Sequence, residues 1–145
     1  MNILVAVDLS PASDVVVEAA RGVAELTGVS IYIIHAVETG SEFTCPEGDP
    51  ETVRKLVADE FPVEHERVQA LADRLLDDGL DAEAFLVCGS AVNATLQQAD
   101  ILEAGLIVVG THGHGAVYDV LIGSFSVEII RKSRLPVLVV PVRET

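Results

Sequence analysis

Residues 106 to 115 join an aliphatic run to a cluster of glycines: Leu106-Ile107-Val108-Val109-Gly110-Thr111-His112-Gly113-His114-Gly115. The short, mostly β-branched run suits a strand that is buried on both faces. Three glycines within six residues at the end of this strand allow a ligand to approach the backbone closely, or allow a positive φ. Gly123-Ser124 then begins a helix, whose first N–H groups lack intrahelical partners. With the hydroxyls of Ser124 and Ser126, these residues indicate either an anion site or an ordinary surface loop, and the residues alone do not separate the two.

Strand-like and helix-like patterns alternate on both sides of this stretch. The predicted strands are Ile3–Val7, Ser30–Val37, Ala82–Cys88, Leu106–Gly110 and Pro136–Val140. Apolar residues at helical spacing predict a helix that starts near Ser10-Pro11 and ends at Gly28, two helices over 53–61 and 68–76, and the helices Ser90–Leu102 and Ser124–Ser133. A polar, loop-like stretch covers Glu38–Pro50. This order predicts the α/β class, with residues 1–145 as one doubly wound domain: an open five-stranded parallel sheet with helices on both faces.

Ligands of such sheets bind beyond the carboxyl ends of the strands, where the strand order reverses. The first predicted strand ends near Asp8 and the fourth ends at Gly110. If the reversal lies between these two strands, both residues face one crevice. His35 is interpreted as an ordinary strand residue rather than a ligand-binding one.

The composition excludes several classes of function. Nine basic and 23 acidic residues give a net charge of −14, which argues against nucleic acid or an anionic membrane as a partner. No stretch reaches the ~20 apolar residues that a membrane helix needs. Two cysteines, Cys45 and Cys88, do not make a disulfide framework. The expected location is therefore a reducing cytoplasm.

The spacing Gly110-x2-Gly113-x9-Gly123-Ser124 resembles the nucleotide-binding signature of the ATP-binding branch of the universal stress protein family, whose fold is related to that of the adenine nucleotide alpha hydrolases. The resemblance covers almost the whole chain and includes the opening Ile3–Asp8 and the closing Leu135–Val140. The glycine spacing together with two flanking strands is a specific signal.

The resemblance implies a role for each matched position. Backbone at Ala6 and Val7 and the carboxylate of Asp8 would meet the adenosine, with Ser10 as a further candidate close by. Val37 would line the adenine pocket, and Val109 and Gly110 would border the ribose and phosphates. The residues expected around the phosphate chain are Gly113, Gly123, Ser124, Phe125 and Ser126.

Three residues depart from the family pattern. Leu9 stands where the family often has glycine after the aspartate, and Gly105 stands where an aspartate is common before the fourth strand. Phe125 is bulkier than the usual small residue, which weighs toward ADP or AMP over ATP. Leu9 and Phe125 therefore keep open a second interpretation, a nucleotide-free dimeric interaction module of the same fold.

The predicted anion site contains no Lys or Arg. We therefore expect Mg²⁺ or Mn²⁺ to be carried by the nucleotide, with no metal site formed by the protein. The glycine pattern is neither a Gly-x-Gly-x-x-Gly fingerprint nor a Walker loop. No general base has a visible nucleophile partner, so no catalytic residue is assigned and slow ATP hydrolysis stays open. An adenylate-forming enzyme, a third interpretation, would need His-x-Gly-His after the first strand, where Asp8-Leu9-Ser10 stands.

The last predicted strand carries a further expectation. Residues Val137–Val142 would form a long apolar edge of the sheet, and such edges are usually covered or paired. The resemblance implies antiparallel pairing with a second copy, while Pro136 and Pro141 offer the alternative of a self-protected edge. The sequence thus predicts an adenine-nucleotide-binding regulator of the stress response. Binding would order the loop from Gly110 to Gly123, and an unidentified protein partner would read that state.

Overall fold

The computed structural model describes residues 1–37, 42–111 and 123–142. The expectations for Gly113 and for the ordering of the glycine-rich loop concern residues 112–122, which lie outside the described residues. The elements, in chain order, are β1 (Asn2–Ala6), α1 (Ala12–Thr27), β2 (Ser30–Val37), α2 (Pro50–Glu60), α3 (Pro62–Asp77), β3 (Ala82–Cys88), α4 (Ala91–Ile101), β4 (Ala104–Gly110), α5 (Ser124–Lys132) and β5 (Val137–Val140).

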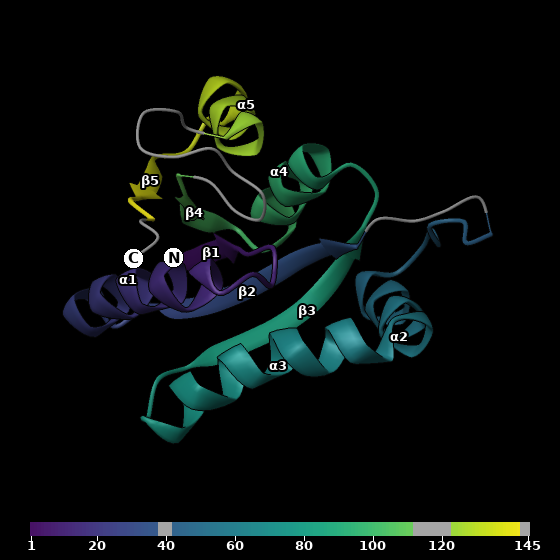
Figure 1. The fold of residues 1–145 in the computed structure, drawn as a ribbon, viewed down its shortest axis with the longest axis horizontal. Helices are drawn as coiled ribbons and strands as arrows, with labels where there is room; N and C mark the ends of the chain where they lie inside the picture. Colours follow the sequence, from purple (N-terminus) through teal and green to yellow (C-terminus); the bar gives the residue numbers. More distant parts are fainter. Residues whose placement is uncertain (38–41, 112–122, 143–145) are drawn as a thin grey trace.

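All five strands form one parallel sheet in the order β3-β2-β1-β4-β5. The chain builds outward from β1 to β3, crosses back through α4, and adds β4 and β5 on the other side of β1 (Figure 1). The predicted fold class is confirmed. The strand order reverses between β1 and β4, so the carboxyl ends of these two neighbours lie side by side.

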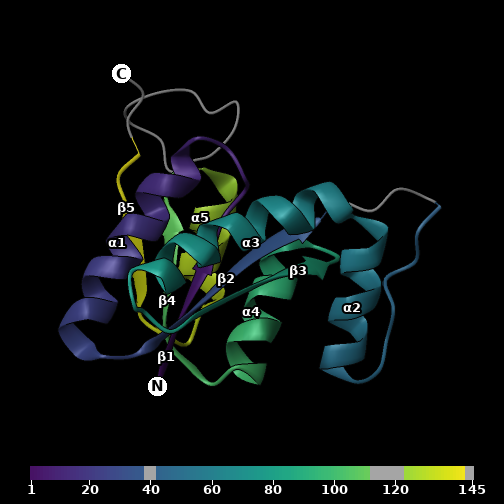
Figure 2. The same cartoon turned by 90° about the horizontal axis from the view of Figure 1, so that it is seen from below.

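Two aliphatic cores lie between the sheet and the helices that cover its two faces. One lies under α1 and α3 and includes Val5, Ile33 and Val108, which are fully buried. The other lies under α4 and α5 and includes Leu4, Ile107 and Ile129. Side chains of successive strand residues point to opposite faces, which explains why Leu4 and Val5 belong to different cores. Figure 2 shows the helices on the two sides of the sheet, with α2 beside β3 at one end.

Local chemistry explains most element boundaries. Gly28 ends α1 with φ +74, and its N–H donates to the carbonyl of Ala24. Asp49 caps α2 by accepting from the N–H of Thr52 at 3.2 Å, and Pro62 separates α2 from α3. Ser10, near which the first helix was predicted to start, does not cap α1 with its side chain, because its buried Oγ has no hydrogen-bond partner among the described residues.

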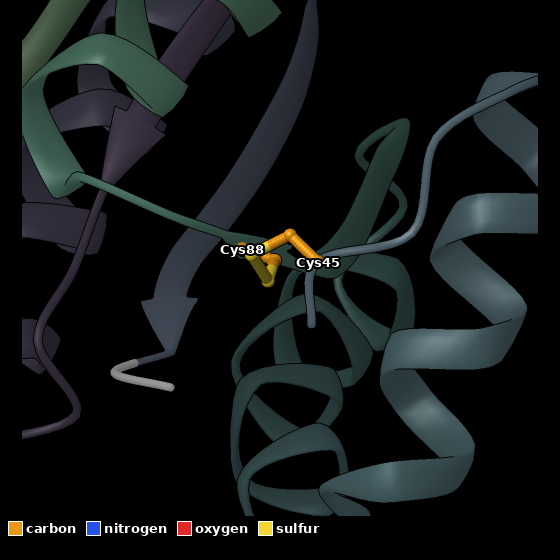
Figure 3. Close-up of a disulfide and its surroundings, with 2 residues drawn as sticks. All are labelled: Cys45 and Cys88. Carbon is orange, nitrogen blue, oxygen red and sulfur yellow. A yellow bond between two sulfur atoms is a disulfide. The ribbon is translucent and has the colours of Figure 1, made fainter. Parts of the chain in front are cut away.

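The cysteines depart from expectation. Cys45 and Cys88 are joined in a disulfide whose Cα atoms lie 5.8 Å apart, across 43 positions of sequence (Figure 3). Counting two cysteines excludes a framework of several bridges, but it does not exclude one bridge. The partner of Cys45 depends on where the segment before α2 crosses the end of β3, and spacing alone does not reveal that. No helix among the described residues is long and apolar enough to cross a membrane.

Candidate functional site

A cavity of about 860 Å³ lies at the carboxyl ends of β1, β2 and β4. Its walls also include the first residues of α1, α4 and α5. The strand and strand-end residues that line it are Ala6, Val7, Asp8, Ile34, His35, Ala36 and Gly110. The helix and helix-start residues are Ala12, Ser13, Val16, Gly89, Ser90, Ala91, Thr95, Gly123, Ser124, Phe125 and Ser126. Its volume lies within the ≈ 300–1,000 Å³ range that is usual for small-molecule sites.

Asp8 lies on the wall that follows β1. Its Oδ1 accepts from the backbone N–H of Ser10 at 2.9 Å and from the hydroxyl of Ser13 at 3.5 Å. These bonds fix the carboxylate between the end of β1 and the first turn of α1. The next residue, Leu9, has φ +63, a left-handed conformation that favours glycine. Arg67 of α3 donates to the carbonyl of Leu9, and the Leu9 side chain is buried.

On the opposite wall of the cavity, hydrogen bonds connect the end of β4 to the start of α5. The hydroxyl of Ser126 donates to the carbonyl of Gly110 at 2.5 Å, and the N–H of Gly123 donates to the carbonyl of Thr111 at 2.6 Å. The first bond inside α5 runs from the N–H of Val127 to the carbonyl of Gly123. The N–H groups of residues 124–126 therefore precede the helical ladder at the cavity wall, as an anion site requires.

The third wall comes from β2 and from the turn between β3 and α4. His35 places its Nδ1 2.9 Å from the carbonyl of Val7. Since a carbonyl oxygen only accepts, Nδ1 carries the hydrogen of this bond. Gly89 has φ +111, which turns the chain sharply from β3 into the cavity wall at Ser90 and Ala91.

Helix N-termini bring positive partial charge to the cavity. Among the described lining residues there is no Lys or Arg, and the acidic one is Asp8. Three helices, α1, α4 and α5, begin at the cavity, and each helix N-terminus is worth about 0.3–1 kcal/mol for a nearby anion at exposed positions. This set of donors favours the phosphate part of a ligand but leaves most of a triphosphate's charge uncompensated. No group of three or more His, Cys, Asp or Glu able to hold a metal occurs in the described part of the chain.

The structure gathers most of the predicted site residues. Those that line the cavity are Ala6, Val7, Asp8, Gly110, Gly123, Ser124, Phe125 and Ser126. Ser10, Val37 and Val109 do not line it, and Gly113 lies outside the described residues. Val37 and Val109 instead pack into the two cores.

Sequence reasoning missed the third wall. His35, Ala36 and Gly89 through Ala91 carry no recognisable spacing, since they come together only through the pairing of β2 with β1 and β3. The available signals were the end of β2 itself, since ligands of parallel sheets bind at the carboxyl ends of strands, and the glycine that follows β3. His35 is hydrogen-bonded, as the sequence interpretation expected, and it also faces the cavity.

Comparison with known proteins gives a consistent result. The model of the Universal stress protein family matches residues 1–141. Universal stress protein A homolog 1 of Coxiella burnetii is 31% identical over 99% of this chain and 97% of its own length. The universal stress protein Rv2005c of Mycobacterium tuberculosis is 29% identical over 94% of this chain, which spans 44% of that longer protein. A universal stress protein solved in complex with cAMP is 26% identical, with a TM-score of 0.70 over 97% of this chain and 96% of that one.

Proposed function

Because the chain belongs to the universal stress protein family, we propose that it binds an adenine nucleotide in the cavity at the ends of β1, β2 and β4. ATP is the proposed ligand, with ADP and AMP as competitors for the same cavity. The protein would act as a regulator in the stress response, and an unidentified protein partner would read its nucleotide state. We propose residues 1–145 as the domain that carries this function, and the cytoplasm as its location.

The start of α5 is the observation that carries the proposal. Gly123 has no side chain to fill the cavity, and the N–H groups of Ser124 to Ser126 are outside the helical ladder. Hydrogen bonds from neutral donors to a charged acceptor contribute about 1.5–3 kcal/mol each. A phosphate group at this point would accept several such bonds in the geometry that helix N-termini provide for anions.

The opposite end of the cavity suits a nucleoside. The Asp8 carboxylate, held by Ser10 and Ser13, would accept hydrogen bonds from ribose hydroxyls. Apolar surface from Val7, Ile34 and Ala36 would cover a purine ring. The universal stress protein solved with cAMP, 26% identical to this chain, supports adenine as the base.

A divalent cation would accompany a triphosphate. The described lining residues supply no cationic Lys or Arg, and the chain has a net charge of −14. Mg²⁺ or Mn²⁺ bound to the phosphates would reduce the charge that the helix N-termini must stabilise. The cation would arrive with the nucleotide, with the hydroxyls of Ser124 and Ser126 nearby.

The proposed signal is the ordering of the loop from Gly110 to Gly123 when nucleotide binds. Residues 112–122 of this loop lie outside the described residues. Support for the proposal comes from its two ends, which are joined by the Gly123–Thr111 and Ser126–Gly110 hydrogen bonds. A phosphate on α5 would therefore bind beside both ends of the loop.

Nucleotide binding is tested on the protein as isolated. The protein is denatured and its supernatant is analysed for adenine nucleotides. Because the chain has two Tyr and no Trp, its own ultraviolet absorbance is low and the absorbance of a nucleotide is easily distinguished. Emptied protein is then titrated calorimetrically with ATP in the presence of Mg²⁺. We expect released nucleotide or a saturable heat. If neither is seen, the proposal fails and the nucleotide-free interaction module is the better account.

We also propose a homodimer through β5, which is an edge strand of the sheet. The carbonyls of Pro136 and Val140 accept from the N–H groups of Ile107 in β4 and of Thr111 just after it, so by alternation Val137 and Val139 turn their backbone groups outward. Val139→Pro would remove one outward N–H while leaving the bonds to β4 in place. Light scattering after gel filtration should show a dimer for the natural chain and a monomer for this variant. A monomeric natural chain would contradict the proposal.

A further inference from the structure

The disulfide lies directly behind one wall of the cavity. Cys88 is the last residue of β3 and Gly89, the next residue, lines the cavity. Cys88 also pairs in register with Val37, the last residue of β2, close to the cavity-lining His35. Neither cysteine lines the cavity itself. Formation or reduction of the disulfide would therefore affect a bound ligand indirectly, by shifting the residues of the cavity wall.

The bond fixes a segment that has little other regular structure. Residues 42–49 precede α2 and contain no helix or strand, and Cys45 connects them to the end of β3 (Figure 3). A second contact is the edge-to-face packing of Phe43 on Phe61, with ring centroids 5.4 Å apart. Breaking the disulfide would release the Cys45 side of the segment, while β3 would stay paired with β2 over seven residues.

Neither cysteine is fully enclosed by the protein. Cys45 and Cys88 are both partly exposed rather than buried. A disulfide in a reducing compartment is usually transient or redox-sensing. A redox-sensing disulfide is compatible with the cytoplasmic location that we propose. There the bond would be either formed or reduced, depending on the ratio of thiols to disulfides in the compartment.

We propose that Cys45–Cys88 is a reversible redox clasp that regulates nucleotide affinity, an inference that rests on the proposed function. In the oxidised state the segment 42–49 holds the turn at Gly89 to Ala91 against the cavity. A wall that is already ordered loses less conformational entropy when ligand binds, so the oxidised protein binds more tightly. Reduction frees the segment, loosens the turn and weakens binding.

The redox step is ordinary thiol–disulfide exchange. The thiolate of a dithiol attacks one sulfur of the Cys45–Cys88 bond, forms a mixed disulfide, and releases the other sulfur as a thiolate. The second thiol of the reductant then displaces the remaining protein sulfur. Two electrons and two protons pass to the protein, which holds two thiols, and the reductant leaves as a cyclic disulfide. A low-molecular-weight disulfide such as oxidised glutathione reverses the step.

The test uses the full chain in both redox states, with dithiothreitol as the dithiol. Thiol titration defines the states, with no free thiol before reduction and two after it. Calorimetry with ATP and Mg²⁺ should show affinity at least about fivefold weaker in the reduced protein, the low end of typical coupling between sites. Amide hydrogen exchange at 89–91 should accelerate on reduction. The double variant Cys45→Ser/Cys88→Ser is the control, and dithiothreitol should change neither its affinity nor its exchange.

Three results would overturn the inference. Equal affinity of the two redox states would refute the clasp while leaving nucleotide binding intact. Absence of binding in both states would refute the proposed function and the clasp with it. A dithiothreitol effect of equal size in the double variant would show that the reductant acts elsewhere.

Discussion

The two sides of the cavity differ in how the sequence builds them. The side formed by β1, β4 and α5 consists of an aspartate after a strand, glycines, and serines at a helix start, and its hydrogen bonds use mainly backbone atoms. The side formed by β2 and the β3–α4 turn consists of unremarkable residues that strand pairing assembles, with a disulfide behind them. The first side suits binding a charged group, and the second suits adjusting how firmly the ligand is held.

Removal of the disulfide should give the largest change in stability. The bond closes a loop with a sequence separation of 43, for which chain entropy predicts about 4 kcal/mol. We expect Cys45→Ser/Cys88→Ser to lose about that much free energy of unfolding in urea. The reduced natural chain should match the double variant. Equal stability of the oxidised and reduced protein would show that the second side does not depend on the bond.

Gly123→Val should give the largest change on the first side. Gly123 has φ −60 and ψ 156, extended backbone that valine adopts readily, so the fold should remain. The new side chain would cover the donors at the start of α5. Loss of two charge-assisted hydrogen bonds, about 3 kcal/mol, would weaken ATP affinity about a hundredfold or more in calorimetry.

Gly22→Val is the matched control for that variant. Gly22 lies in α1, and a Cβ there would meet no heavy atom within 4 Å. Its ATP affinity should equal that of the natural chain. An unchanged affinity in Gly123→Val would place the phosphates elsewhere.

Leu9 allows a sharper test of the wall after β1. Its φ of +63 costs an aliphatic residue or alanine roughly 1–2 kcal/mol relative to glycine. Leu9→Gly and Leu9→Ala both lose the buried side chain, but Leu9→Gly should be more stable than Leu9→Ala by about 1 kcal/mol in thermal or urea unfolding. This order reverses the usual ranking of alanine over glycine. If alanine is the better substitute, the backbone at Leu9 is not left-handed.

Ser126→Ala should give the smallest effect. The variant removes the hydroxyl that donates to the carbonyl of Gly110, a hydrogen bond worth about 1 kcal/mol. We expect a correspondingly modest loss of unfolding free energy and a weaker tie between β4 and α5. Ser133→Ala, which loses a hydroxyl paired with Leu135 after the other end of α5, is the control. It should leave ATP affinity unchanged, whereas Ser126→Ala should lower it.

The strands were predictable because short apolar, β-branched runs and the turn residues that bound them indicate the same elements. The predicted bounds of β2 and β3 are those of the structure, while β1 runs one residue earlier at each end than expected. Gly28 and Pro62 mark boundaries through backbone chemistry that any tertiary context must respect.

The candidate site was predictable on one side only. Asp8, Gly110 and Gly123 stand at strand ends or helix starts, so topology alone directs them to the crevice. Val37 was expected to line the cavity, but its side chain packs in a core, and His35 and Ala36, which precede it, line the cavity instead. The contact between Cys45 and Cys88 depends on the path of a segment without regular structure, for which periodicity offers no information.

The decisive experiment is a crystal structure with Mg²⁺ and a non-hydrolysable ATP analogue. We expect phosphate oxygens within hydrogen-bond distance of the N–H groups of Ser124 to Ser126, and ribose hydroxyls on the carboxylate of Asp8. An analogue bound elsewhere, or a cavity that stays filled by Phe125 and its neighbours, would contradict it.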